Sequence, residues 1–215
     1  PNQNFGASLP FYRVQAEETF SHIKDIFVEA MDNIENAMIR DEYKLWIYKE
    51  YLLPSKRFLL TVHTLTKTHL QALDTLTDKH IKKWSGLPRS ATNALIHMKE
   101  GMDVKSISEL YMEAHCVSHA RTRLLGDSSV NNVINCILAR ESSLNTKKCT
   151  TTEVEASFNS VLQLNTVQGE IPHFTGERAA TLQHQFNSEV RSTLKKHIQS
   201  SHDTVWRDHV KSLTV

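Results

Sequence analysis

Histidine and cysteine are the side chains that could hold a metal ion, and this chain has twelve histidines and three cysteines. His115, Cys116 and His119 have the best spacing, because histidines four residues apart face the same side of a helix, as two zinc ligands would. No second pair stands nearby. The other cluster is spaced by five and seven residues and contains no cysteine: His197, His202 and His209. We therefore expect satisfied or exposed histidines and no metal site.

Motifs for covalent or phosphate chemistry are also missing. The sequence has no G-x-S-x-G nucleophile turn, no phosphate loop ending in Gly-Lys-Ser/Thr and no H-E-x-x-H zinc helix. We expect no catalytic residues. An enzyme with an unrecognised site stays an alternative, although no constellation of acid, base and nucleophile supports it.

Charge is unevenly distributed, although the net charge is only +1. Residues 14–39 carry six acids and one base, whereas Arg40–Arg89 carry ten bases and five acids. Clustered Lys and Arg favour phosphate binding, because they release counterions from nucleic acid. Ordinary solvated faces give the same pattern, and a helix C-terminus favours cations such as Lys82 and Lys83.

Aromatic residues interleave with these bases: Trp46, Tyr48, Tyr51 and Trp84. Such rings could stack on nucleotides, but aromatic residues at helical spacing more often pack a core. The sequence alone leaves both roles open.

Long helices must position these side chains, because only six Gly and five Pro punctuate 215 residues. Apolar residues recur every three or four positions in several segments, which predicts an all-α fold. We expect a helix from Arg40 to Leu53 that Pro54 ends, a third helix that begins near Pro54, and a short one that Ser90 caps and that runs to Met98. The other expected helices span residues 14–39, 66–84, 104–125, 129–139, 153–164 and 177–213.

Composition excludes some classes. The chain is 40% hydrophobic and 23% charged, and no apolar run approaches the roughly 18 residues of a membrane span. The odd cysteine count, Cys116, Cys136 and Cys149, favours a reducing, intracellular compartment. Because the chain starts with Pro1 and has no leader pattern, we expect a segment of a longer protein.

Two runs of residues carry a family resemblance. They are DEYKLWIYKEYLLPSKRFLLTVHTL at Asp41–Leu65 and IKKWSGLPRSAT at Ile81–Thr92. In order and spacing they resemble the segment after the palm in reverse transcriptases of non-LTR retrotransposons. NFGASL at Asn4–Leu9 resembles the strand that closes the palm, and HVKSLTV at 209–215 resembles the entry to a further helical region. Ser85 departs from the family's usual leucine.

This resemblance implies a thumb-like helical bundle followed by further long helices, with a short strand remnant at the N-terminus. The expected divisions are a palm-like strand segment at 1–12, the thumb-like bundle at 13–140, a polar linker at 141–152 and a C-terminal helical region at 153–215.

The resemblance also implies a function in binding template and primer. The partners would be an RNA/DNA hybrid or duplex nucleic acid, together with the palm and fingers of the same polypeptide, and the location would be nuclear. The palm would hold Mg²⁺ on paired aspartates, but no Asp-Asp pair occurs here, so this chain would not polymerise alone.

The expected backbone contacts are the bases within or beside the matching runs. They are Lys44, Lys49, Lys56, Arg57, Lys79, Lys82, Lys83 and Arg89. A thumb recognises the shape of the duplex through its phosphates and does not read base edges. A structural or protein-interaction helical domain, such as a decayed or host-adopted remnant of a retroelement, is the main alternative.

Overall fold

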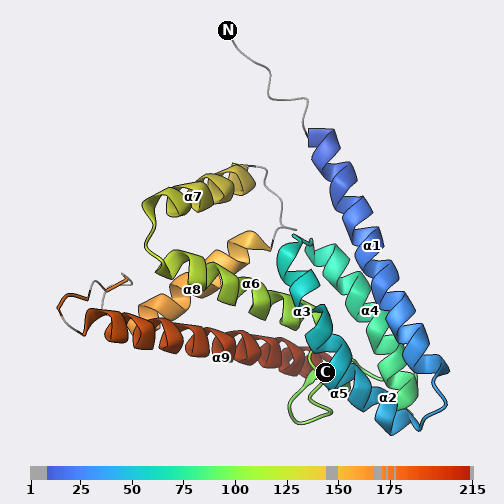
Figure 1. Ribbon diagram of the computed structural model, residues 1–215. Coiled ribbons are helices and arrows are strands. Elements are labelled where there is room, and N and C mark those ends of the chain that lie inside the picture. The colour runs from blue at the N-terminus through green and yellow to red at the C-terminus, as the bar shows by residue number, and fades with distance from the viewer. Residues whose placement is uncertain (1–8, 144–149, 167–170, 173, 177, 214–215) are drawn as a thin grey trace. The chain divides into compact units, whose positions relative to one another are not determined.

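The computed structural model describes residues 9–143, 150–166, 171–172, 174–176 and 178–213 (Figure 1). Helices make up all the regular secondary structure of these residues, which confirms the predicted all-α class. The chain divides into two compact units, residues 1–91 and 92–215. The predicted linker at 141–152 therefore lies within the second unit.

The first unit is built from three packed helical segments. Its elements are α1 (Leu9–Asn36), α2 (Asp41–Ile47), the π-helix η2 (Tyr48–Leu52), α3 (Leu53–Val62) and α4 (Lys67–Trp84). Helix α1 lies along α4, as Figure 1 shows, and α2 packs against both. Apolar residues at helical spacing on α1, namely Ile23, Phe27, Met31 and Ile34, are buried in this core.

The predicted start of a helix near Pro54 is confirmed, because α3 begins at Leu53, but the prediction that Pro54 ends the preceding helix was wrong. The backbone stays helical from α2 into α3, and Leu53, which precedes the proline, has φ −56° and ψ −50°. Proline lacks an amide hydrogen and its ring crowds the carbonyl four residues earlier. The wider π-turn of Tyr48–Leu52 precedes Pro54, which stands in the first turn of α3, where a missing N–H is tolerated.

Helix α4 begins and ends as the sequence predicts. The Thr66 hydroxyl accepts a hydrogen bond from the amide of His69 at 3.2 Å, which caps the N-terminus. At the other end Gly86 has φ +66°, the Leu87 amide donates to the Lys82 carbonyl at 2.8 Å and the Gly86 amide donates to the Lys83 carbonyl at 3.2 Å. This is a Schellman motif, in which glycine supplies the left-handed residue.

The second unit has its own core. Its elements are α5 (Ala94–His97), α6 (Ile107–Leu124), α7 (Ser128–Ser143), α8 (Thr151–Asn165) and α9 (Ala179–Leu213). Helices α6, α8 and α9 pack together around buried residues that include Ala120, Phe158, Val161 and Leu194. Helix α5 packs on α9, where the rings of His97 and Trp206 stack 5.1 Å apart.

Three local expectations need correction or fall outside the structure. Ser90 does not cap α5; the helix begins at Ala94, whose amide donates to the Thr92 hydroxyl at 3.3 Å. Residues 9–12 of the expected strand remnant are helical, and residues 1–8 lie outside the described residues. The ends of the expected linker belong to α7 and α8, and its residues 144–149 lie outside the described residues.

Candidate nucleic-acid interface

Glu35, near the end of α1, joins the helices of the first unit. Its carboxylate accepts a hydrogen bond from the Trp84 indole at 2.6 Å and is paired with the ammonium of Lys83. The His80 imidazole lies 3.7 Å from the same carboxylate. The Glu35 backbone carbonyl also accepts from Lys44 at 3.0 Å. Glu35 thus holds the C-terminal end of α4 and the start of α2 together.

The hydrogen bonds from Lys83 and Trp84 lower the pKa of Glu35 from 4.5 to about 2. Donors that bind the charged form of an acid stabilise that form, and here they outweigh the opposing effect of burial. The carboxylate is therefore ionised at neutral pH and neutralises part of the positive charge at this end of α4.

Beyond Glu35, three further basic residues belong to the last turns of α4 and the turn that follows it. Lys79 and Lys82 stand three residues apart and so share a side of the helix. The Schellman turn at Gly86 reverses the chain, so that the Lys82 ammonium donates to the Arg89 carbonyl at 3.4 Å. Lys79 and Arg89 are exposed, and within the described residues no hydrogen bond or ion pair engages their side chains. We call Lys79, Lys82 and Arg89 the basic turn.

Lys83 belongs to this end of α4 but has a second role. Its side chain is 66% exposed, yet its ammonium is paired with Glu35. The charge of Lys83 is therefore partly compensated inside the unit, unlike the charges of Lys79 and Arg89.

Lys44 points into the unit. It is buried, and its ammonium lies 3.2 Å from an Asp41 carboxylate oxygen as well as at the Glu35 carbonyl. A buried ammonium needs such partners, since its desolvation is costly without them. The geometry assigns Lys44 to packing between α1 and α2, and we leave it out of the candidate interface.

Lys49, Lys56 and Arg57 lie apart from the basic turn in the chain. They are half-buried residues of η2 and α3. Long basic side chains often cover apolar surface with their methylene groups while the charge stays at the solvent boundary. These three form a second group of cations on the first unit.

The aromatic residues separate into two roles that the sequence could not distinguish. Tyr48 and Trp84 are buried and meet edge to face at 6.4 Å, which packs η2 against the end of α4. Burial also raises the pKa of the Tyr48 hydroxyl. Trp46 and Tyr51 are instead exposed and contact each other at 5.1 Å. Tyr43 and Phe58, which the sequence analysis did not single out, are exposed on the same helices.

The histidines that had ligand spacing make other contacts. The ring of His115 lies 4.1 Å from that of Tyr111, Cys116 is fully buried, and His119 is paired with Glu155 of α8. Burial lowers the pKa of His119. Within the described residues, no three His, Cys, Asp or Glu side chains gather as a metal ion would require.

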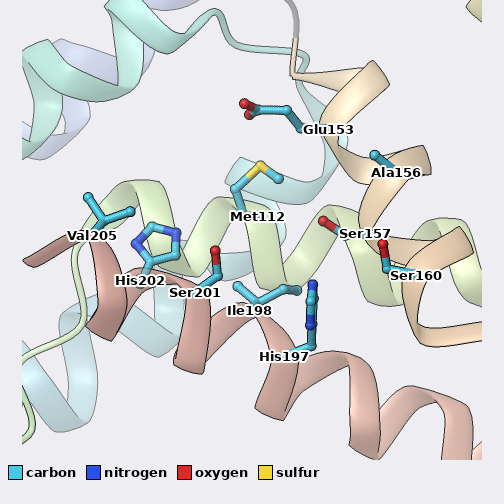
Figure 2. A pocket seen from close by; sticks show the side chains of 10 residues that line it. All are labelled: Met112, Glu153, Ala156, Ser157, Ser160, His197, Ile198, Ser201, His202 and Val205. Atoms are coloured by element: carbon cyan, nitrogen blue, oxygen red, sulfur yellow. The ribbon is translucent and has the colours of Figure 1, made fainter. Parts of the chain in front are cut away.

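The second unit has a groove between α8 and α9, with a volume of about 440 Å³. Figure 2 shows the lining side chains of α8 and α9 with Met112 of α6 between them. Hydroxyl and imidazole groups predominate among its polar residues: Ser157, Ser160, His197, Ser201 and His202. Burial lowers the pKa of His202, so this imidazole is neutral at pH 7. Neither Lys nor Arg is among the described residues that line the groove.

A buried acid lies at the start of α6. Ser106 caps this helix by accepting a hydrogen bond from the Glu109 amide at 3.0 Å. Burial raises the pKa of the Glu109 carboxyl from 4.5 to about 7. Its neighbour Glu113 is paired with Lys105 at 2.6 Å. The helix cap and the Glu113–Lys105 pair stabilise the start of α6, whereas ionisation of the buried Glu109 carboxyl costs stability.

Comparisons with known proteins give no relative: no family model, no curated protein and no solved structure matches this chain. Within the described residues, no helix is both long and apolar enough to cross a membrane.

Proposed function

We propose that this chain binds the sugar-phosphate backbone of double-stranded nucleic acid, as the part of a reverse transcriptase that holds template and primer. An RNA/DNA hybrid is the expected ligand. The proposal rests on the resemblance of Asp41–Leu65 and Ile81–Thr92 to non-LTR retrotransposon polymerases and on the cations that these runs contribute.

The basic turn is the observation that carries the proposal. Like charges three or four residues apart on a helix are destabilising unless something compensates them. The helix dipole stabilises cations only in the last turn. It therefore accounts for the positive charge of Lys82 but not for the charges of Lys79 and Arg89. Phosphate groups would compensate all three, with release of counterions.

The same proposal explains why the most specific sequence motif is a turn. In IKKWSGLPRS, Trp84 binds Glu35 through its indole, and Gly86 supplies the left-handed residue that brings Arg89 back to Lys82. The motif therefore positions cations on a rigid helix end.

Catalysis would belong to the palm of the same polypeptide. Its paired aspartates would hold Mg²⁺, which stabilises charge in phosphoryl transfer. On this proposal the chain works in the nucleus and contributes binding only.

The test is the affinity of the chain for a labelled RNA/DNA hybrid across a salt series. We compare the wild type with a variant that replaces Lys79, Lys82 and Arg89 by alanine. Each lost phosphate contact lowers the slope of log affinity against log salt by about 0.9, so three contacts lower it by about 3. The variant should also bind more weakly at low salt.

A charge-matched control separates specific contacts from net charge. Replacing Lys99, Arg121 and Lys196, exposed residues of the second unit, by alanine removes the same charge elsewhere. The control should keep the wild-type slope. Equal losses in both variants, or no binding by the wild type at low salt, would refute the proposal and favour a structural or protein-interaction domain.

A further inference from the structure

The outward side of α2, η2 and α3 carries exposed aromatic rings. Tyr43 is 56% exposed, Trp46 50%, Tyr51 59% and Phe58 78%. We call these four residues the aromatic face. Soluble proteins rarely leave large apolar side chains together on a surface unless that surface binds something.

The π-helix brings two of these rings together. Residues five apart on a regular α-helix lie about 140° apart around its axis, so Trp46 and Tyr51 would point in different directions. The π-turn at Tyr48–Leu52 holds more residues per turn and reduces this separation. As a result the two rings meet edge to face at 5.1 Å on the exposed side. π-turns inside helices occur frequently at functional sites.

Aromatic residues predominate over aliphatic residues among the exposed apolar side chains of these helices. Among the exposed large apolar residues of α2, η2 and α3, only Val62 is aliphatic. Leu52, Leu53 and Leu60 of the same helices are buried instead. Apart from the buried Tyr48, the aromatic rings of these helices are exposed, as a surface that stacks planar ligands requires.

Positive charge accompanies the rings. Lys49 lies between Trp46 and Tyr51 in the sequence, and Lys56 and Arg57 precede Phe58. Across α2, η2 and α3, residues 41–62, four bases stand against three acids, and two of these, Lys44 and Asp41, pair with each other. The contact between Tyr48 and Trp84 further joins η2 to the end of α4 that carries the basic turn. This small excess of basic residues, together with the neighbouring basic turn, favours an anionic ligand.

We propose that the aromatic face binds single-stranded nucleic acid by stacking unpaired bases on Trp46 and Tyr51, with Phe58 and Tyr43 extending the surface. Lys49, Lys56 and Arg57 neutralise the adjoining phosphates. Stacking tolerates any base, because every base has a flat face, so this contact has little sequence preference. The inference goes beyond the duplex contact of the basic turn and stands without it.

The experiment compares two ligands of equal length and charge: a labelled oligothymidylate and the corresponding abasic oligomer. Both present phosphates, but only the first presents bases. The wild-type chain should bind the oligothymidylate more tightly. Trp46→Ala should lower this affinity about tenfold, in the range of one lost stacked base, and leave the affinity for the abasic oligomer unchanged.

Further variants keep the result interpretable. Trp46→Phe retains a flat ring and should keep most of the preference for bases. Leu164→Ala removes an exposed apolar side chain from the second unit and should behave as the wild type. Circular dichroism verifies that each variant keeps its helices. Both tryptophan variants should bind the RNA/DNA hybrid as the wild type does, whereas alanines in the basic turn lower that affinity.

Two results would overturn the inference. One is equal binding of the abasic and base-containing oligomers by the wild type. The other is self-association of the wild type that Trp46→Ala abolishes, with the affinity for oligothymidylate unchanged. The second result would identify the aromatic face as a contact between copies of the chain.

Discussion

At the residue scale, lysines that look alike in the sequence have different structural roles. Lys44 and Lys83 belong to the matching runs and Lys79 lies beside one of them, but Lys44 is buried, Lys83 is paired with Glu35, and Lys79 is exposed. Sequence predicted which residues are cations. The sequence could not predict the partners of these cations, because Glu35 lies 48 positions before Lys83 and no local pattern distinguishes it from other acids.

We expect acid to destabilise the first unit by protonating Glu35. Its pKa is about 2 in the folded chain, against the ordinary glutamate value of 4.5. Because the folded pKa is lowered, the stabilisation is fully present above about pH 5 and is lost as the pH falls toward 2. Protonation removes the negative charge that both donors bind.

Glu35→Gln should lower the free energy of unfolding by about 1–2 kcal/mol at pH 7, since charge-assisted hydrogen bonds are replaced by a neutral one. The difference from the wild type should shrink between pH 5 and pH 2, as the wild-type carboxylate becomes protonated. Urea denaturation across this pH range measures both effects. Glu29→Gln, at an exposed position of α1, is the matched control and should show neither. A difference that is constant with pH would contradict the assignment.

At the element scale, sequence predicted helices better than their junctions. The periodicity of α1, α4 and α9 gave their bounds within a few residues. Pro54 was misleading because its effect depends on the turn before it, and a π-turn has no simple sequence signature. For the same reason the meeting of Trp46 and Tyr51, five residues apart, could not be predicted from α-helical spacing.

The Schellman turn at Gly86 should be destabilised by a side chain at this position. Gly86 has φ +66°, which side chains rarely adopt, and a Cβ there would contact nothing within 4 Å. Gly86→Ala should therefore cost about 1 kcal/mol through backbone strain alone. Gly86→Asn should cost less, because asparagine tolerates this conformation. Urea denaturation of the three proteins would give the order Gly, Asn, Ala; an alanine variant as stable as the wild type would contradict it.

At the scale of the whole molecule, the division of the chain was the least predictable feature. Composition suggested a boundary in the polar stretch at 141–152, but α7 and α8 flank that stretch and both pack on α6. The boundary falls instead between Ala91 and Thr92, just after the basic turn. Polar composition marks exposed chain, whereas a unit is defined by which helices share a core, and those contacts are distant in sequence.

Because each unit has its own core, we expect the two units to unfold in separate thermal transitions. Leu73 is fully buried in the first unit and Leu194 in the second. Replacing a buried leucine by alanine typically costs about 2–5 kcal/mol, because packing is lost and a cavity remains. We expect Leu73→Ala to lower the midpoint of one thermal transition and Leu194→Ala that of another, as measured by differential scanning calorimetry. Leu164→Ala, at an exposed position, should leave both midpoints in place. A single transition that both core variants lower equally would show that the two units fold as one cooperative body.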